Sequence, residues 1–324
     1  DSGALAGLMV EAGARDLHGI TVAFREFEGR ADDEAPVAVQ VAECYGIKHH
    51  VRWVSRQEFD EDLPRILGAM DQPSMDGINT WFASKAVAEL GLKVVVSGLG
   101  GDELFQGYGS FSRIPKLQRA VATSSRIPGM PLAMRLLCGL VGKVRGNARY
   151  AHIPNYARSL PGAWLLSRGV FAESELPGLM PGQLPALKPL AWIETAAAPL
   201  SDNPRLAVSQ LESAFYMRNQ LLRDSDWASM AHSIELRTPL VDAHMLRRLG
   251  PQLAQFENFP GKTLLAGAVQ PALPPAVTGR GKTGFGVPMA AWLASGSQDD
   301  RGGQSRAWAR RVAAAWSSGA MPCG

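Results

Sequence analysis

The chain has 324 residues, of which 46% are hydrophobic, and a formal net charge of +3. This length allows one large domain or two ordinary ones, with enough apolar residues for a sizeable core. The small net charge argues against a nucleic-acid-binding protein, which concentrates far more basic charge on one face.

The cysteines and the apolar runs indicate in which cellular compartment the protein is expected. Cys44, Cys138 and Cys323 are scattered and form no CxxC pair, so neither a zinc site nor a disulfide framework is indicated. This usage is typical of a reducing compartment, and we expect a cytoplasmic location. The most apolar stretch, residues 127–144, contains two prolines and Arg135, so we expect no membrane-spanning segment and no membrane partner.

Strands and helices are expected to alternate in the first part of the chain. Apolar periodicity predicts helices at residues 2–13, 34–45 and 79–90, and strands at residues 20–24, 49–54 and 93–96. This alternation predicts an α/β fold in which a parallel sheet has helices on its faces.

Beyond the α/β region the pattern becomes mainly helical. Helices are expected within residues 115–145 and at residues 205–223, whereas the proline-rich residues 176–190 are expected to form a loop. Residues 295–324 are rich in Gly, Ser, Arg and Ala with little apolar periodicity, and we expect them to be disordered.

A glycine-rich turn is the most informative motif. The run Ser97-Gly98-Leu99-Gly100-Gly101-Asp102-Glu103-Leu104-Phe105 directly follows the predicted strand. A strand that enters such a turn and then a helix presents backbone N–H groups to phosphate, and a carboxylate at its end can hold a cation. The alternative is a tight structural turn in which Asp102 caps the helix.

Three further segments carry a family resemblance. They are the start Asp1-Ser2-Gly3, the run from Leu221 to Asp242 that contains Ser229-Met-Ala-His-Ser-Ile-Glu235, and the run from Arg280 to Trp292. Together with the glycine-rich turn and in this order, they resemble the synthetase domain of glutamine-hydrolysing asparagine synthetases. The resemblance covers residues 1 to about 293.

The resemblance implies a fold of the adenine nucleotide α-hydrolase, or ATP-pyrophosphatase, type over residues 1–293. The expected division is an α/β part at residues 1–110, a helical part at residues 111–293 and an unmatched tail at residues 294–324. The implied reaction is the ATP-dependent, AMP-forming amidation of aspartate to asparagine. A substrate carboxylate attacks the α-phosphate of ATP, and ammonia then displaces AMP.

The same resemblance implies the site residues. Asp1 and Ser2 match the end of the family's phosphate loop, so Asp1 and Asp102 are the expected magnesium ligands. ATP is expected to contact residues at the start of the chain, in the predicted strand at residues 20–24 and in the glycine-rich turn, namely Ser2, Val22, Ser97, Gly98, Gly100 and Gly101. Their alternative roles are structural: Val22 also fits a core strand, and the glycines fit a plain turn.

Two residues are expected to act on the reacting groups. Lys282 matches the family lysine that stabilises charge in adenylation, although it also fits a solvated lysine in a glycine-rich loop. Glu235 falls in the segment that lies beside the substrate in the family. The alternative role of Glu235 is a structural ion pair with Arg237.

Several departures leave the acceptor open. Leu99 stands where several asparagine synthetases carry glutamate, and Trp227 replaces the usual arginine after Asp226. The alternatives are the same mechanism on another carboxylate, as in surface-sugar amidotransferases, β-lactam synthetases or lasso-peptide cyclases, and an inactive nucleotide-binding fragment. The low charge and the lack of a zinc-binding cysteine set argue against a tRNA-modifying ATP pyrophosphatase.

The family's N-terminal glutaminase domain, first strand and start of the phosphate loop have no counterpart in the sequence. We therefore expect a fragment of a longer protein, in which the remaining strands flank a gap and ATP turnover is small or absent. The expected partners are small-molecule substrates and the glutaminase domain, with a homodimer as one allowed assembly.

Overall fold

A computed structural model describes residues 1–30, 33–180, 188–197, 199–253, 255–256, 260–279, 286–293 and 304–319. The chain divides into two compact units. The α/β unit combines Asp1–Gly107 with Gln220–Trp292, and the helical unit combines Tyr108–Asn219 with Leu293–Ala320. Lys282 lies outside the described residues.

The first part of the α/β unit alternates helices with strands, as predicted. Its elements are α1 (Ser2–Glu11), β1 (His18–Phe24), the 3-10 turn η1 (Arg25–Phe27), α2 (Ala35–Tyr45), β2 (Lys48–Val54), α3 (Arg56–Ala69), α4 (Ile78–Glu89), β3 (Val94–Val96) and α5 (Gly101–Leu104). The helix α2 ends at Gly46, which has φ +64°, because glycine adopts this left-handed conformation without strain.

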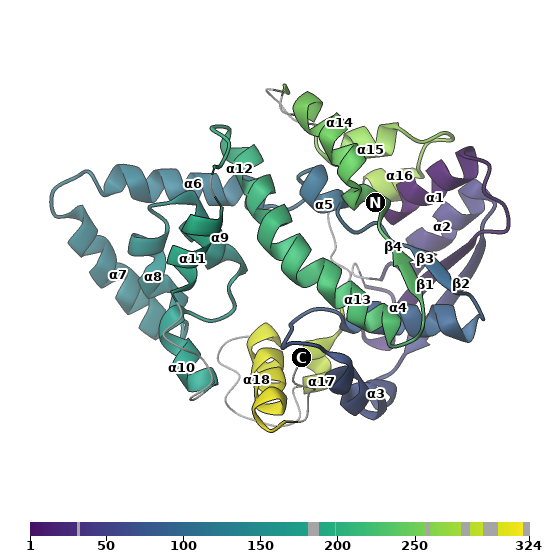
Figure 1. Cartoon of the computed structure of the whole chain (residues 1–324), viewed down its shortest axis with the longest axis horizontal. Coiled ribbons are helices and arrows are strands. Elements are labelled where there is room, and N and C mark those ends of the chain that lie inside the picture. The colour runs from purple at the N-terminus through teal and green to yellow at the C-terminus, as the bar shows by residue number, and fades with distance from the viewer. Residues whose placement is uncertain are drawn as a thin grey trace. The chain divides into compact units, whose positions relative to one another are not determined.

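The described strands form two separate parallel pairs, β1 with β2 and β3 with β4 (Glu235–Arg237). Val22 of β1 lies opposite Arg52, and Val94 of β3 lies opposite Glu235. Both α2 and α4 pack against β1 (Figure 1). The α/β class and the parallel pairing are confirmed.

The second part of the α/β unit returns after the helical unit. Its elements are α13 (Leu222–Met230), β4, the 3-10 turn η4 (Pro239–Val241), α14 (Ala243–Leu253), α15 (Lys262–Gly267), α16 (Pro275–Thr278) and α17 (Met289–Leu293). A buried cluster joins the two parts, with Leu5 of α1, Leu104 of α5, Leu240 of η4 and Val269 in contact. The start of the chain is thereby fixed to segments that are more than 200 residues away in sequence.

The helical unit is built from short helices around its own core. They are α6 (Ser110–Ser124), α7 (Met130–Val144), α8 (Arg149–Tyr156), α9 (Leu160–Arg168), η2 (Glu173–Glu175), α10 (Leu176–Leu179), α11 (Pro189–Ala196), α12 (Pro204–Leu211) and α18 (Gln304–Ser317); the π-helix η3 (Glu212–Leu221) continues α12. Phe111, Trp164, Leu211 and Phe215 meet in the core.

The structure differs from the expectations in several places, among them the loop expected at residues 176–190, where Leu176–Leu179 form α10 and Pro189 begins α11. Residues 220–292 belong with the α/β part rather than with one helical part at residues 111–293, because β4 pairs with β3 and α13 packs on α4. Residues 304–317, expected to be disordered, form α18, in which Trp308 and Val312 are buried one turn apart. The helix α3 was not predicted, although Ser55 and Glu58 form a capping signature and the Ser55 side chain accepts from the Glu58 N–H at 3.2 Å.

Within the part of the chain that the structure describes, none of the helices has the length and apolar character needed to cross a bilayer.

Gly77 illustrates how closely α13 packs on α4. It has φ +93° just before α4, and a Cβ added there would lie 2.4 Å from Cζ2 of Trp227. The large side chain of Trp227 therefore fits only against a residue without a side chain.

We predict that Gly77→Ala lowers the free energy of unfolding by about 2–4 kcal/mol, because backbone strain and overpacking each cost roughly 1–3 kcal/mol. Denaturant unfolding measures this loss. The matched control is Gly13→Ala, since Gly13 has φ +86° and no described atom within 4 Å of an added Cβ. Equal losses in the two variants would contradict the steric role of Trp227.

Candidate active site

The N-terminus of α1 lies directly against the glycine-rich turn. Asp1 is the N-cap residue of α1. A Cβ added to Gly98 would lie 2.7 Å from the Ser2 nitrogen, and one added to Gly101 would lie 2.6 Å from Cγ of Asp1. The turn approaches Asp1 and Ser2 this closely only because both positions are glycine.

A lysine that the sequence analysis did not single out joins the two predicted metal ligands. The Lys262 ammonium lies 2.6 Å from Oδ2 of Asp1 and 2.6 Å from Oδ1 of Asp102. The two carboxylates are 16% and 19% exposed, so their mutual repulsion is only partly screened by water and the ammonium offsets it. Residues from three distant parts of the sequence thus converge on one cation position.

The remaining glycines of the turn fit against structure rather than open space. Gly100 has φ +91°, and an added Cβ would lie 2.5 Å from Cγ2 of Val241 in η4. At Gly107 an added Cβ would lie 2.0 Å from Oδ1 of Asp102 and 2.4 Å from Cε of Lys262. Gly107 was not predicted as a site residue, yet it controls the position of both charged groups.

Ser97 and Val22 occupy framework positions. The Ser97 N–H donates to the Arg237 carbonyl at 2.8 Å, and the Ser97 hydroxyl accepts from the Leu99 N–H at 3.3 Å. Ser97 therefore ties the turn to the end of β4. Val22 is 6% exposed in β1 and contributes to the core. These contacts fit the structural roles, and they leave nucleotide contacts by the same residues as a proposal.

Glu235 is placed at the other end of the β3–β4 pair from the turn. Its carboxylate accepts from Nε of Arg237 at 2.8 Å, and both side chains are 60% exposed. This pair lowers the pKa of the Glu235 carboxyl, first through the hydrogen bond and then through charge attraction. The structure thus joins Glu235 to Arg237, while Asp1 and Asp102 meet at Lys262.

The segment from Leu221 to Asp242 mostly builds the scaffold. Buried Asp224 accepts from the Ser74 hydroxyl at 2.5 Å and from the Trp227 indole at 3.0 Å. His232 packs edge-on against Trp81 with ring centroids 4.4 Å apart. Asp242 accepts from the backbone N–H groups of His244 and Met245 at the start of α14. These contacts explain the residue types without a catalytic role.

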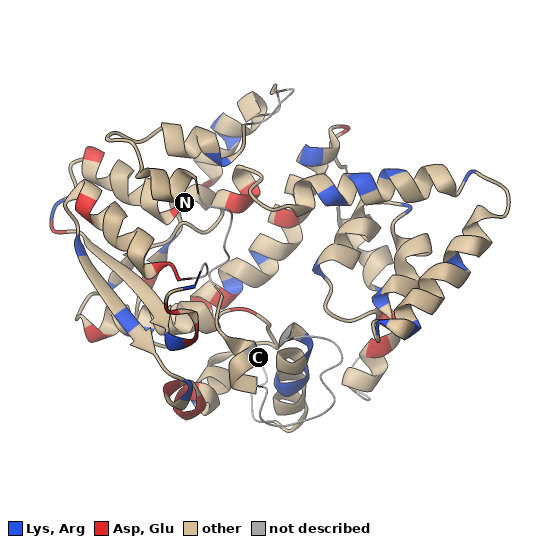
Figure 2. Cartoon of the chain, turned by 180° about the vertical axis from the view of Figure 1, so that it is seen from behind, with Lys and Arg blue, Asp and Glu red and all other residues tan. Residues whose placement is uncertain are grey.

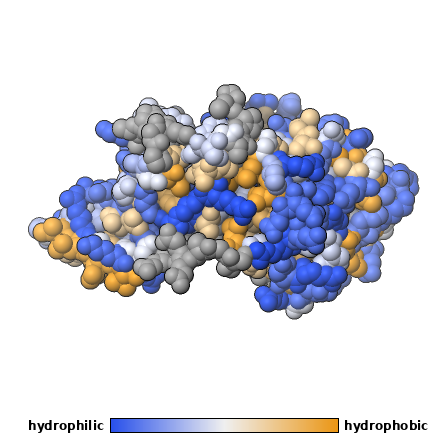
Figure 3. Space-filling view, turned by 90° about the horizontal axis from the view of Figure 1, so that it is seen from below, coloured by the Kyte–Doolittle hydropathy of each residue, from blue (hydrophilic) through white to orange (hydrophobic). Residues whose placement is uncertain are grey.

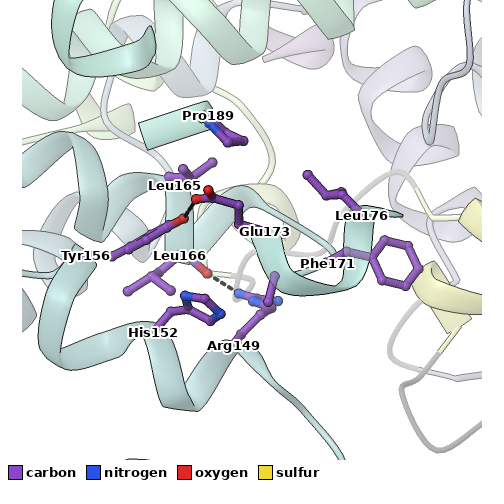
Figure 4. Close-up of a pocket in the computed structure, with 10 residues that line it drawn as sticks. Arg149, His152, Tyr156, Leu165, Leu166, Phe171, Glu173, Leu176 and Pro189 are labelled. Atoms are coloured by element: carbon purple, nitrogen blue, oxygen red, sulfur yellow. Dashed lines mark hydrogen bonds between the residues drawn. The ribbon is translucent and has the colours of Figure 1, made fainter. Parts of the chain in front are cut away.

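A small cavity lies in the helical unit, and several of the side chains that line it form polar contacts (Figure 4). Its volume is about 40 Å³, far below the several hundred Å³ that a nucleotide needs. Tyr156 donates to Glu173, Arg149 donates to the Leu166 carbonyl, and His152 lies 3.2 Å from the Ser174 hydroxyl. This cavity is separate from the predicted site residues.

Parallel strands, a glycine-rich turn and carboxylates at the start of helices are features of α/β nucleotide-binding domains. A family model described as asparagine synthase matches residues 1–315, and the chain therefore belongs to the asparagine synthase family. The match extends beyond residue 293, where the sequence resemblance was expected to end.

Individual relatives agree with this family. A Mycobacterium tuberculosis protein named "Putative asparagine synthetase (glutamine-hydrolyzing)" is 30% identical over 322 residues, covering 91% of this chain and 45% of that protein. "Asparagine synthetase (glutamine-hydrolyzing) 1" of Bacillus subtilis is 27% identical over 315 residues, covering 90% of this chain and 46% of that protein. The chain thus spans a little under half the length of these curated relatives.

The donor set of the Asp1–Asp102 cluster fits magnesium. Proteins hold this ion through one or two carboxylates, with substrate phosphates and water completing the coordination. Here two carboxylate oxygens lie within 2.6 Å of one positively charged nitrogen, so they already converge on a cation position. A divalent ion would take this position by displacing the flexible Lys262 ammonium.

We predict that Lys262→Gln raises the affinity of the nucleotide-free protein for Mn²⁺ roughly tenfold, because the competing positive charge is removed. A Mn²⁺ titration followed by electron paramagnetic resonance measures this change. Lys48→Gln is the control, since Lys48 forms a comparably close but exposed pair with Asp16. An unchanged Mn²⁺ affinity in the Lys262 variant would rule out competition for the two carboxylates.

Burial of Asp224 makes the stability of the folded protein depend on pH, and the direction follows from its pKa. Burial raises the pKa of this carboxyl to about 6, against the opposing hydrogen bonds from Ser74 and Trp227. The folded state therefore binds the proton more tightly than the unfolded state, whose carboxyl has a pKa near 3.8. Stability is lost as the pH rises from about 4 to about 6.

Asp224→Asn is expected to remove this loss, which amounts to at most about 3 kcal/mol for a shift of about two pKa units. The measurement compares the free energy of unfolding of wild type and variant near pH 4.5 and near pH 7. The exposed neighbour Asp226 supplies the control, Asp226→Asn. A stability difference between wild type and Asp224→Asn that is the same at both pH values would refute the role of Asp224.

Proposed function

We propose that the protein catalyses the ATP-dependent, AMP-forming amidation of aspartate to asparagine, with ammonia derived from glutamine. Membership of the asparagine synthase family supports the reaction class. The observation that supports the site is the convergence of Asp1 and Asp102 on one cation position beside the glycine-rich turn. Neither alternative, another carboxylate or an inactive nucleotide-binding domain, is favoured by the relatives.

The reaction has two displacement steps. An oxygen of the substrate carboxylate attacks the α-phosphorus of ATP, and the bond to the β-phosphate oxygen breaks to release pyrophosphate. The nitrogen of ammonia then attacks the acyl carbon, loses a proton, and AMP leaves with the former carboxylate oxygen. Negative charge therefore develops first on pyrophosphate and later on AMP.

The chain has hydrogen-bond donors that could stabilise the negative charge that develops on pyrophosphate. The N–H groups at the start of α1, including that of Ser2, carry the positive end of the helix dipole. Gly98, Gly100 and Gly101 let the turn approach Asp1, Ser2 and Val241 closely, and their backbone groups are proposed to contact the nucleotide. Ser97 and Val22 are proposed to border the adenosine. Bound magnesium would neutralise phosphate charge, held by Asp1 and Asp102.

Two further residues complete the proposal. Lys282 is proposed to stabilise the negative charge on the transferred phosphate, a task suited to a compact cation. Glu235 is proposed to lie near the substrate, although its pairing with exposed Arg237 supports a structural role equally well. We also propose a cytoplasmic location, a glutaminase domain as the source of ammonia, and a homodimer as the assembly.

We predict that the full-length protein forms AMP and asparagine from ATP, magnesium, aspartate and ammonium. Asp102→Asn and Lys282→Ala should each lower kcat/KM roughly hundredfold or more, because each removes a charge that acts in the transition state. Coupled measurement of AMP and chromatographic measurement of asparagine provide the two readouts.

The matched control is Asp202→Asn, an exposed carboxylate in the helical unit. It should retain the wild-type rate, which separates loss of a specific charge from loss of net charge. If ATP is cleaved to AMP only with a different carboxylate, the mechanism stands and the acceptor is not aspartate. If no carboxylate supports AMP formation, the proposed function is wrong.

A further inference from the structure

The helix α7 exposes an apolar face that the helical unit leaves uncovered. Leu132, Leu136, Leu140 and Val144 follow one another at four-residue spacing and are 63%, 69%, 60% and 79% exposed; neighbouring Leu137 is 62% exposed. Residues at this spacing lie on one side of a helix. Apolar surface gathers at the left end of Figure 3, consistent with an exposed patch of this kind.

The opposite side of α7 packs against the rest of the helical unit and holds the helix in place, so the apolar face stays exposed. Met134 packs against the core of the helical unit. Gly142 lies close to α8, because an added Cβ would lie 3.6 Å from the Ala151 nitrogen and 3.2 Å from the carbonyl oxygen of Asn147, just before α8. The inner side therefore holds the helix in place, and the outer leucines add nothing to the core.

The charge of the surrounding segment is strongly one-sided. Between Glu103 and Glu173 the sequence contains ten Lys or Arg residues and no Asp or Glu. Exposed basic residues lie before, within and just after α7, at Arg126, Arg135, Lys143 and Arg145. The helices α6 to α9 carry blue positions in Figure 2. The small net charge of the whole chain conceals this local excess.

Apolar side chains flanked by basic residues are the recognised pattern of helices that lie in the surface of an anionic membrane. With 15 residues, α7 is too short to span a bilayer, which takes about 20, so it would lie parallel to the surface. Pairing two copies through this face would place like charges next to each other, which disfavours a second copy as the occupant.

We propose that the exposed face of α7 docks onto an anionic lipid surface. The leucines enter the boundary between headgroups and acyl chains, and Arg126 and Lys143 contact the lipid phosphates. Arg135 and Arg145 donate to Asn155 and Tyr150 within the unit and add to the local positive charge. The proposal differs from the expectation of no membrane partner, which considered only spanning segments. The docking surface is separate from the Asp1–Asp102 cluster and does not depend on the proposed reaction.

Vesicle flotation tests the proposal with the purified full-length protein. We expect binding to phosphatidylcholine vesicles that contain about 30% phosphatidylglycerol, and roughly tenfold less binding to pure phosphatidylcholine vesicles. The double variant Leu136→Ser and Leu140→Ser should bind the anionic vesicles roughly tenfold less, because two apolar side chains no longer enter the lipid. Binding should also fall in about 0.5 M NaCl.

Met230→Ser is the matched control, because Met230 is a comparably exposed apolar residue, at 58%, in the α/β unit. It should bind as wild type does, and circular dichroism should be unchanged in all variants. Absence of vesicle binding would overturn the proposal, as would binding that the double variant retains. Sedimentation that shows a dimer lost in the double variant, without vesicle binding, would instead identify a second copy as the occupant and also overturn it.

Discussion

The sharing of one ammonium group by two carboxylates organises the candidate site. Asp1 begins α1, Asp102 lies in α5, and Lys262 begins α15, so the contact ties together segments that are otherwise far apart in the chain. Without a positive charge the two carboxylates would repel each other in a partly buried environment. The packing of α1 against the glycine-rich turn therefore depends on a cation, either the lysine or an ion that replaces it.

The contact also relates the resting structure to the proposed chemistry. The two carboxylates need a positive charge even without a ligand. Anionic phosphate groups can therefore bind beside them only together with further cations. Lys262 is 36% exposed, so its side chain can move from the carboxylates toward solvent once another cation replaces its charge. It would then be free to face the phosphates, which are also anionic.

The sequence identified one side of this site and missed the other. The glycine-rich turn and Asp102 follow directly on a predicted strand, so local pattern was sufficient. Lys262 lies 160 residues beyond Asp102 in a segment without a distinctive motif, and only the fold brings it there. Local pattern also could not place residues 220–292 in the α/β part. The pairing of β4 with β3 is a long-range contact that periodicity does not reveal.

Other misses had a readable local signal. Ser55 and Glu58 form a capping pattern that indicates the start of α3. The four-residue spacing of Trp308 and Val312 fits a buried helical face. The basic segment around α7 was hidden by averaging charge over the whole chain. The steric role of Trp227 required the structure, because Gly77, against which it packs, lies 150 residues earlier on another element.

Gly101 and Gly107 have a consequence for natural variation. Every missense change of a glycine codon adds a Cβ atom, and at these two positions that atom would overlap the carboxylate of Asp1 or of Asp102. The overlap falls on charged side chains at the edge of the unit rather than on its buried core. Inherited variants at these codons would thus displace the carboxylates of the charged cluster directly, whatever side chain replaces the glycine.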